Sequence, residues 1–417
     1  MIVRTSGRDD GEHFDALVLG AGAAGLICAV EAARRGLAVA LVDHQARAGR
    51  KLALAGGGMG NVTNRLLDVR HYVGADLSPC RAAFRRFGPD AVLALLAELN
   101  IPWEERGFGQ IFCLRPAREL ADGLERLGRE AGVSFRLGKR VDEAARTTGP
   151  DGTSLFRLRS EAGTLLAPQL VIATGGPACP QAGATDFGGR LAARWGHRVT
   201  PFRPALVPLI MPEDWPLRGL EGISLSARLS VLPADGGEPR LDPCDARPLL
   251  FTHRGLSGPA GLAASCLWNR GDTLNVDFLP AEPTAAWLHD PAHGKLLVRT
   301  LLARRLPERL AERLCPPDLA RRKAAEVGKK DALRLADAVH RHRVIPSGTE
   351  GLRKAEAAAG GVRTQDLDSR LQSRLVPGLF FCGEVLDVTG LLGGYNLHWA
   401  FASAHLTAGA LRTARGS

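Results

Sequence analysis

The first regular pattern in the chain is a short apolar run that leads into glycines and then into a helical pattern. Residues 14–25 read F-D-A-L-V-L-G-A-G-A-A-G, and residues 26–35 continue with apolar positions at helical spacing. A second apolar run, residues 37–42, ends at Asp43. Strand, glycine turn, helix and second strand in this order predict a βαβ unit that binds a dinucleotide.

Each glycine of this turn has a physical role in such a unit. Gly20 permits the tight turn, Gly22 lets backbone N–H groups approach a pyrophosphate, and Gly25 lets the helix pack close to the strand. The helix N-terminus then offers unpaired N–H groups to the phosphates, and the acid after the second strand suits a ribose hydroxyl. The candidate cofactor residues here are Gly20, Gly22, Ala23, Ala24, Gly25 and Asp43.

A glycine-rich segment follows the second strand. Residues 47–64 read R-A-G-R-K-L-A-L-A-G-G-G-M-G-N-V-T-N. Its glycines allow an extended backbone that presses against a ligand, its basic residues suit phosphate, and its last residues offer polar side chains. We expect a second wall of the cofactor site, although a flexible surface loop is the alternative. The candidates are Arg50, Lys51, Gly58, Asn61, Thr63 and Asn64.

Two later apolar strands end in small or acidic residues. Residues 170–176 read L-V-I-A-T-G-G and residues 378–384 read G-L-F-F-C-G-E. Loops at the carboxyl ends of such strands hold the ligands of an α/β sheet, although Glu384 could instead be a solvated carboxylate. Residues 393–396, G-G-Y-N, precede an apolar helix whose N-terminus would stabilise negative charge, or they simply start that helix. The candidates are Thr174, Gly175, Gly383, Glu384, Gly394, Tyr395 and Asn396.

The pattern changes in the middle of the chain. Four prolines between residues 201 and 212 exclude a central strand or a helix interior there. Short strand patterns at residues 225–232, 247–252 and 275–279 then predict a small barrel or sandwich. Residues 284–339 are instead helical and rich in charge, which indicates an inserted helical bundle.

Composition and charge narrow the class of protein. The 417 residues are 45% hydrophobic and carry a net charge of +10, so the chain is globular, basic and long enough for two or three domains. The densest basic run, residues 320–330, has no interleaved aromatics, which favours a solvated surface and disfavours nucleic acid as a partner. No run approaches the roughly 20 apolar residues that span a bilayer, and no signal-peptide pattern begins the chain, so we expect a cytoplasmic protein without membrane contact.

The eight cysteines give no sign of a metal site or of a disulfide framework. None of them forms a C-x-x-C pair, and their spacing matches no zinc motif. Buried thiols in a reducing compartment are the expected state, and no metal is expected.

In combination, the glycine turn and the segments at residues 56–64, 170–176 and 383–396 resemble the BaiN-like, YhiN-type family of FAD-dependent oxidoreductases. Further carriers are P-A-C-P-Q-A-G-A-T-D-F-G-G after residue 176, R-P-A-L-V-P-L at residues 203–209 and F-T-H-R-G-L-S-G-P at residues 251–259. The resemblance implies an α/β fold: a Rossmann-like FAD-binding domain with an inserted β-barrel domain that itself carries a helical insertion. The implied boundaries are 1–197 and 359–417 for the FAD-binding domain, 198–280 and 341–358 for the barrel, and 281–340 for the helices.

The chain departs from the pattern of the family at several positions. Met59 and Gly60 stand where the family usually has Arg-Cys, and His398 stands where Gln is common. Cys179 occupies a position that is often aromatic, and it is a candidate reactive thiol, with inert packing as the alternative. His253 is the candidate proton donor and Arg254 the candidate anchor for an anion, although a histidine in a turn is often structural.

The resemblance implies that FAD is bound non-covalently and performs the redox step. We expect transfer of a hydride or electrons from a reduced donor to an organic small molecule held between the FAD and barrel domains. NAD(P)H is a possible transient donor, because the chain has one complete G-x-G-x-x-G in a strand–helix context and hence no separate nicotinamide domain. An FAD-dependent tRNA-modifying enzyme and a non-catalytic flavin-binding sensor are the alternatives. The sequence predicts no oligomeric state.

Overall fold

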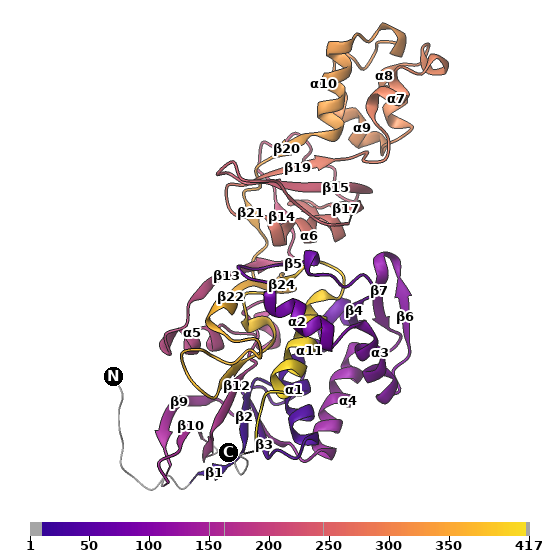
Figure 1. The fold of residues 1–417 in the computed structure, drawn as a ribbon. Helices are drawn as coiled ribbons and strands as arrows, with labels where there is room; N and C mark the ends of the chain where they lie inside the picture. The colour runs from indigo at the N-terminus through magenta and orange to yellow at the C-terminus, as the bar shows by residue number, and fades with distance from the viewer. Residues whose placement is uncertain (1–10, 150, 162, 245, 414–417) are drawn as a thin grey trace. The chain divides into compact units, whose positions relative to one another are not determined.

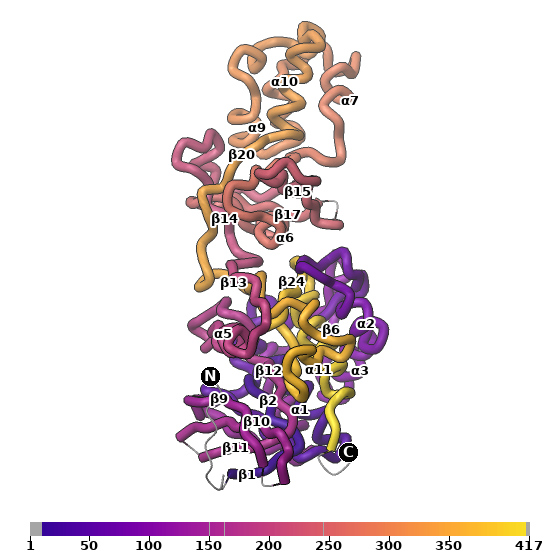
Figure 2. Tube along the Cα trace, turned by 60° about the vertical axis from the view of Figure 1, so that its left-hand side comes forward, coloured from indigo at the N-terminus to yellow at the C-terminus, as the bar shows by residue number. Residues whose placement is uncertain are grey.

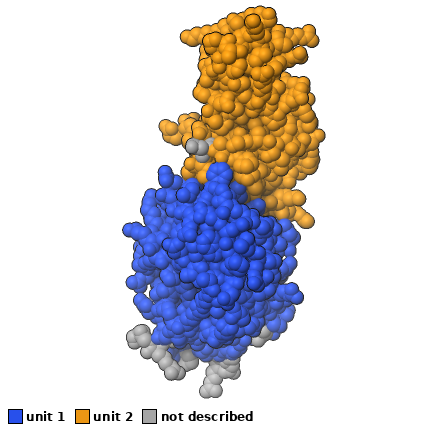
Figure 3. Space-filling model, turned by 90° about the vertical axis from the view of Figure 1, so that its right-hand side faces the viewer, with its two compact units in different colours: residues 1–203, 356–417 blue, residues 204–355 orange. Residues whose placement is uncertain are grey.

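A computed structural model describes residues 11–149, 151–161, 163–244 and 246–413 of the chain. The chain divides into two compact units: residues 1–203 with 356–417, and residues 204–355 (Figure 3). No helix in the described ranges is long and apolar enough to cross a membrane. The boundaries that separate a barrel from a helical subdomain stay predictions.

Unit 1 is built around a five-stranded parallel sheet (Figure 1). Its order is β23 (Leu379–Phe381), β12 (Gln169–Ile172), β2 (Ala16–Leu19), β3 (Val39–Asp43) and β8 (Ser134–Leu137). Every residue of β2, β12 and β23 is buried, as expected for parallel strands covered on both faces. β2, the first of these five strands along the chain, lies at the centre with two strands on either side, which is the strand order of a Rossmann-like fold. The α/β prediction is therefore confirmed.

Three helices pack against one another beside this sheet. They are α1 (Ala23–Arg34), α4 (Ala117–Glu130) and α11 (Tyr395–Ala408); α1 contacts both others. Figures 1 and 2 show α1 beside α11, although their first residues are 372 positions apart in the sequence. The α11 helix is apolar almost all round and is buried along most of its length, which a helix without a polar face requires. The C-terminal segment thus completes the layer that the N-terminal βαβ unit begins.

Smaller sheets surround this core. One has the order β1 (Glu12–His13), β11 (Gly163–Ala167), β10 (Ser154–Ser160), β9 (Val141–Thr148), and another the order β4 (Asn61–Asn64), β7 (Gln110–Cys113), β6 (Trp103–Arg106). Two-stranded pairs join β13 (Val199–Ala205) to β22 (Ala357–Val362) and β24 (Thr389–Gly390) to β5 (Tyr72–Val73). The remaining helices of unit 1 are α2 (Ser78–Arg86), α3 (Pro89–Glu98) and α5 (Phe187–Arg194).

One strand assignment from the sequence is corrected by the pairing. The sequence alone predicts that residues 133–137 form a strand of one small sheet with residues 155–160 and 164–167, but β8 pairs in parallel with β3 at the edge of the central sheet. The preceding helix α4 acts as a crossover connection, and such a connection returns the chain parallel to its earlier strands. The small sheet instead gains β9, whose alternation of buried and exposed residues is weak.

Unit 2 is mainly an antiparallel sheet with one buried helix, α6 (Gly258–Leu267). The strand order is β20 (His342–Val344), β19 (Thr273–Asp277), β15 (Ser224–Leu232), β17 (Arg247–Phe251), β18 (Gly255–Ser257), β14 (Leu209–Ile210) and β21 (Gly348–Thr349), and β16 (Arg240–Leu241) also pairs with β15. Within the described part of the chain the two end strands do not pair with each other, so closure into a barrel stays a prediction.

A helical segment interrupts this sheet between β19 and β20. Its helices are α7 (Thr284–Leu288), α8 (Val298–Ala303), α9 (Glu308–Leu314) and α10 (Lys329–His340). Leu301, Leu310 and Leu335 are fully buried among them, so the segment has its own small core. The helical pattern predicted for residues 284–339 is therefore present, as short helices rather than one long bundle.

Candidate functional site

The N-terminus of α1 lies at the carboxyl end of β2, where the sequence predicts phosphate binding. Gly20 has φ of +109°, and a Cβ there would lie 2.6 Å from the carbonyl oxygen of Ala173. A Cβ at Gly25 would lie 1.8 Å from the carbonyl oxygen of Gly20, so only glycine allows this approach of helix and turn. Gly22 precedes the helix without a side-chain cap, and no described atom lies within 4 Å of the position that its Cβ would take.

The first N–H groups of α1 have no hydrogen-bond partner among the described residues. Ala23, Ala24 and Gly25 form the first turn of the helix, whose earliest internal hydrogen bond runs from Leu26 N to Gly22 O. Unpaired N–H groups and the helix dipole together favour an anion at this position.

Asp43 closes the loop beside this helix. Its two carboxylate oxygens accept backbone N–H hydrogen bonds from Ala21 and Gln45, each at 2.7 Å. The acid is therefore fixed at the carboxyl end of β3, next to the glycine turn, where the sequence predicts the contact with a ribose.

Lys51 and Glu384 form an ion pair that joins distant parts of unit 1. Lys51 Nζ lies 2.9 Å and 2.7 Å from the two carboxylate oxygens of Glu384. Glu384 also accepts a hydrogen bond from the backbone N–H of Ala358 at 2.9 Å, and the N–H of Gly176 lies 3.4 Å away. One carboxylate thus connects the glycine-rich segment, the end of β12 and the start of β22, which excludes the alternative of a free solvated carboxylate.

Gly383 brings this carboxylate to the start of α1. The residue has φ of +78°, and a Cβ on it would lie 2.8 Å from the Cβ of Ala24. Its N–H donates to Ser403 Oγ at 2.9 Å, and its carbonyl accepts from Trp399 Nε1 at 3.2 Å. Both partners belong to α11, so this helix fixes the loop after β23 against the glycine turn.

The polar side chains of β4 are used for bonds within the protein. Thr63 Oγ1 lies 2.8 Å from His398 Nδ1, and Asn64 Nδ2 donates to the carbonyl of Gly393 at 2.9 Å. Asn61 Nδ2 donates to Gln110, whereas Asn61 Oδ1 is buried and has no hydrogen-bond partner in the described part of the chain. These residues hold the loop before α11 against β4, and a direct contact with a cofactor stays a prediction for them.

The state of His398 follows from its surroundings. The ring is fully buried, and this burial lowers the pKa of His398 to about 4. Its Nε2 lies 3.0 Å from the carbonyl oxygen of Phe87, which only accepts hydrogen bonds, so Nε2 carries the proton. Nδ1 is then an acceptor for the hydroxyl of Thr63, and the neutral ring connects β4 to the end of α2.

The segment that starts α11 is shaped by its glycines and by one amide. A Cβ at Gly394 would lie 2.5 Å from the carbonyl of Thr63, and Gly394 has φ of +87°. The side chain of Asn396 donates to the carbonyl of Gly390 at 2.7 Å and accepts from its N–H at 2.9 Å. Tyr395 is fully buried and stacks on His71 at 4.5 Å. Here the side chains build the helix start, so its backbone is the part left for a ligand.

The other predicted residues of unit 1 lie in the loops after β3 and after β12. Arg50 hydrogen-bonds the side chain of Gln45 and the carbonyl of Gln181, so it connects the loop after β3 to the loop after β12. Thr174 Oγ1 is buried without a partner among the described residues, and Gly175 has φ of +68°. Cys179 is half-buried with φ of +65°. Gly58, also at positive φ, ends a 3-10 turn over residues Leu52–Gly58 rather than an extended segment.

His253 and Arg254 lie in unit 2, on the turn between β17 and β18. Both are exposed, and neither side chain has a hydrogen bond or ion pair with any described residue. The turn itself is rigid, since Thr252 Oγ1 accepts from the N–H groups of Arg254 and Gly255. Their catalytic roles stay predictions.

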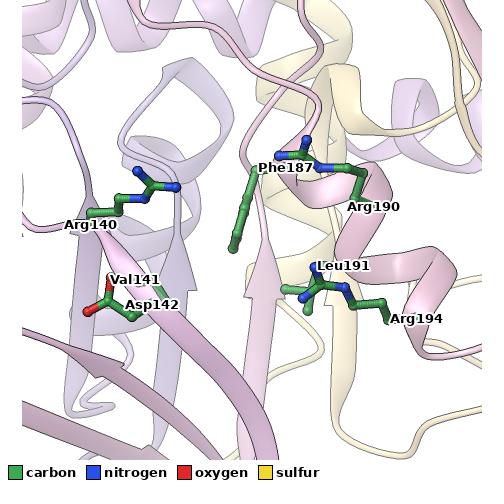
Figure 4. Close-up of a pocket in the computed structure, with 7 residues that line it drawn as sticks. All are labelled: Arg140, Val141, Asp142, Phe187, Arg190, Leu191 and Arg194. Carbon is green, nitrogen blue, oxygen red and sulfur yellow. The ribbon is translucent and has the colours of Figure 1, made fainter.

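A cavity of about 240 Å³ in unit 1 was missed from the sequence. Its walls come from the start of β9 and from α5, and Figure 4 shows Phe187 between Arg140 on one side and Arg190 on the other. The loop before it is tied to the dinucleotide turn, because Lys139 N donates to Asp43 O at 3.0 Å. The lining residues are Arg140, Val141, Asp142, Phe187, Arg190, Leu191 and Arg194. The spacing of residues in the sequence does not indicate that these two segments, about forty-five residues apart, meet in the fold.

Comparison with known proteins assigns the family. The model of the HI0933-like protein Rossmann domain matches residues 14–410. The chain belongs to this family. Among its relatives, a ribosomal RNA dihydrouridine synthase of Escherichia coli is 38% identical, and the match covers 97% of this chain and 100% of the relative. A protein with that same description in Haemophilus influenzae is 34% identical over 95% and 98% of the two chains. A 3-dehydro-bile acid delta(4,6)-reductase of Clostridium scindens is 29% identical over 93% and 97%.

The family resemblance predicted from the motifs is confirmed, and this HI0933-like protein is an FAD-dependent oxidoreductase. The residues of unit 1 fit FAD on structural grounds. The first N–H groups of α1 and the buried oxygens Thr174 Oγ1 and Asn61 Oδ1 have no partner among the described residues, and a cavity begins at Arg140, next to Lys139, whose N–H donates to Asp43. Unsatisfied buried polar atoms are costly, so these groups fit a bound polar ligand.

Proposed function

We propose that this protein is an FAD-dependent reductase that adds hydrogen across a carbon–carbon double bond conjugated to a carbonyl group. The named activities of its relatives share this chemistry: forming a dihydrouridine saturates a bond conjugated to a uracil carbonyl, and a delta(4,6)-reductase acts on bonds conjugated to a 3-oxo group. A hydride enters at the carbon remote from the carbonyl, and a proton enters at the carbon beside it.

FAD supplies the hydride step when it is bound, and the protein supplies binding and orientation. We assign the pyrophosphate to the N–H groups of Ala23 and Ala24, and the ribose to Asp43. We assign the adenine ring to the cavity lined by Val141 and Phe187, whose neighbour Lys139 is bonded to Asp43. Lys51 and Glu384 fix the loops that cover the middle of the cofactor.

Two further groups of this chain would act on the flavin end and on the substrate. The N–H groups that begin α11 after Gly394 favour negative charge, because a helix N-terminus carries partial positive charge. His253 would give its proton to the substrate carbon beside the carbonyl, and Arg254 would hold the carbonyl oxygen through its guanidinium. NAD(P)H is the proposed hydride donor.

The observation that carries the proposal is the uncapped start of α1 beside Asp43, closed over by Gly383 and the Lys51–Glu384 pair. The test is anaerobic titration of the purified holoprotein with NADH and NADPH, followed by enone substrates. Bleaching of the flavin by either nicotinamide and its recovery on adding an enone supports a reductase. A flavin that neither nicotinamide reduces would remove the proposed donor and favour a sensor or an oxidase.

A second candidate is reduction of a uracil base within RNA. The observation that favours it is the 38% identity, over nearly the whole chain, to a ribosomal RNA dihydrouridine synthase. The sequence analysis gives a tRNA-modifying enzyme as an alternative, and this candidate widens its substrate from tRNA to RNA in general. It predicts that RNA rather than a free enone reoxidises the reduced flavin, and that dihydrouridine forms in the product.

A further inference from the structure

The helical segment of unit 2 carries a strong excess of positive charge. Residues 284–343 contain fourteen lysines and arginines against seven aspartates and glutamates. Some of these acids already form ion pairs within the segment. Asp318 and Asp331 pair with Arg334 at 2.9 Å and 3.1 Å, and Asp331 pairs with Arg322 at 2.7 Å. These guanidinium groups hold the pKa values of both carboxyls below their usual range. Arg305 and Arg341 also have acidic partners, Glu282 and Asp337, so the uncompensated charge lies on the other cations of the segment.

Four of these cations are brought together by one bridge between two chain segments. Leu297 and Lys323 form an isolated antiparallel bridge, flanked by hydrogen bonds from Val298 N to Arg322 O and from Ala324 N to Leu296 O. Every member of the group is exposed and lies within two residues of the bridge, and its side chain forms no ion pair with a described residue; the backbone N–H of Lys323 donates to Glu326 at 3.2 Å. This basic cluster consists of Lys295, Arg299, Arg321 and Lys323.

We propose that the basic cluster is a docking surface for the phosphate backbone of RNA. This inference rests on the proposed function in its RNA form, and it assigns the substrate contact to a part of the chain outside the flavin unit. Grouped cations repel one another at low salt, so a surface of this kind is stabilised by a polyanion that neutralises it. The arginines and lysines would contact phosphates and position the RNA without reading its sequence.

The composition of the segment favours structured RNA over the other anionic partners. Its one aromatic residue, Trp287, is buried, so bases of a single strand have no exposed ring on which to stack. Of the large apolar side chains described in this segment, only Leu333 is exposed, whereas binding to a lipid surface requires an apolar face. The sequence alone predicts a solvated surface for the dense basic run at residues 320–330. The structure shows in addition that this run pairs with residues 295–299 through the bridge of Leu297 and Lys323.

The experiment measures fluorescence anisotropy of a labelled RNA hairpin with the full-length holoprotein at several KCl concentrations. The test variant combines Lys295→Gln, Arg299→Gln, Arg321→Gln and Lys323→Gln. The control variant removes four charges from exposed arginines of unit 1, by Arg81→Gln, Arg86→Gln, Arg115→Gln and Arg126→Gln. A charge-preserving variant with arginine at positions 295 and 323 completes the set.

We expect the test variant to bind the hairpin at least about tenfold more weakly and to lower the slope of log K against log salt by about 3, while the control and the charge-preserving variant bind like the wild type. Equal loss in the control variant, no loss in the test variant, or no binding of RNA by the wild type at low salt would overturn the proposal. Binding of phosphatidylserine vesicles in place of RNA would also overturn it.

Two further readouts separate this proposal from the proposed function. Bleaching of the flavin by NAD(P)H, and turnover of any small enone that the wild type accepts, involve none of the four substituted residues, and the test variant is expected to keep both. If RNA binding fails while these readouts persist, the docking surface is wrong and the reductase stands. If RNA binding depends on the basic cluster while the flavin is never reduced, the surface stands and the reductase is wrong.

Discussion

Lys51 Nζ lies within 2.9 Å of both carboxylate oxygens of Glu384, although 333 residues separate the two along the chain. Both side chains are partly buried, with 30% and 20% of their surface exposed. The pair joins the glycine-rich segment after β3 to the loop after β23, and Glu384 also accepts the N–H of Ala358 at 2.9 Å. It therefore joins two distant parts of the sequence within unit 1, at the edge that we propose binds FAD.

Disrupting this pair should weaken both folding and FAD binding. We expect Glu384→Gln and Lys51→Met each to lower FAD affinity about tenfold, which corresponds to about 1.4 kcal/mol. The double variant should cost less than the sum, with a coupling energy of about 1–2 kcal/mol, because the two residues act through one contact. Flavin titration of the apoproteins measures the affinities.

A surface ion pair of the same unit provides the matched control. Arg65 and Asp90 lie 2.8 Å apart, but Asp90 is 91% exposed, so Arg65→Gln and Asp90→Asn should show a coupling below about 0.5 kcal/mol. Additive effects at Lys51 and Glu384 would contradict their assignment as one unit.

Alanine substitutions at Gly22 and Gly25, at the start of α1, should affect cofactor binding and folding separately. Alanine at Gly25 would place a Cβ 1.8 Å from the Gly20 carbonyl, so Gly25→Ala should destabilise the apoprotein by about 3 kcal/mol or more. Alanine at Gly22 meets no described atom within 4 Å, and its cost in stability should be no more than about 1 kcal/mol. Because that space is assigned to the pyrophosphate, Gly22→Ala should nevertheless lower FAD affinity at least about tenfold.

Thermal unfolding of the two apoproteins and their flavin titrations test this contrast. Full FAD affinity in Gly22→Ala would show that the open space before α1 does not receive the phosphates. A stable Gly25→Ala protein would mean that the helix can move away from β2.

The central βαβ unit was predictable because its signals are local. The apolar run of β2, the glycines and the helix α1 follow one another within twenty residues, and the close contact of Gly25 is with Gly20 in that same turn. The ends of β12 and β23 were likewise predictable from short apolar runs that stop at glycines.

The contacts that complete the site were not predictable, because they depend on which distant segments meet. The bond of Thr63 to His398 spans 335 residues, and nothing in either segment names the other. Asn396, which is predicted as a cofactor residue, also hydrogen-bonds both backbone groups of Gly390, a contact set by the tight turn before α11. The cavity between Val141 and Phe187 depends on how β9 and α5 pack, which no spacing rule supplies.

His398 should make the protein sensitive to acid. Its pKa is about 4 in the folded chain and about 6.5 when unfolded, so the unfolded state binds the proton first as pH falls. The free energy of unfolding should therefore decrease between pH 6.5 and pH 4, by up to about 3 kcal/mol from this group. Glutamine at this position can still accept from Thr63 and donate to Phe87, but it does not titrate.

We accordingly expect His398→Gln to lose less stability than the wild type between pH 6.5 and pH 4 in denaturant unfolding. His398→Ala should be destabilised by about 2–4 kcal/mol above pH 7, since it leaves a buried hydroxyl and a buried carbonyl unpaired. Parallel acid profiles for the wild type and His398→Gln would refute the neutral buried imidazole.

His253 offers the sharpest test of the chemistry, because its side chain lies exposed on a turn and has no partner among the described residues. His253→Ala should leave thermal stability and FAD content unchanged while lowering kcat for an enone about a hundredfold, the usual loss for a missing general acid. Reduction of the flavin by the nicotinamide should keep its rate, since the proton is needed only when the substrate is reduced. Arg254→Lys serves as the matched variant: the turn and the charge remain, but the planar guanidinium is lost, so KM should rise with little change in kcat. An unchanged kcat in His253→Ala would remove this residue from the reaction and leave the proton to another donor, whereas a loss of bound FAD would show that the turn supports the cofactor rather than the substrate.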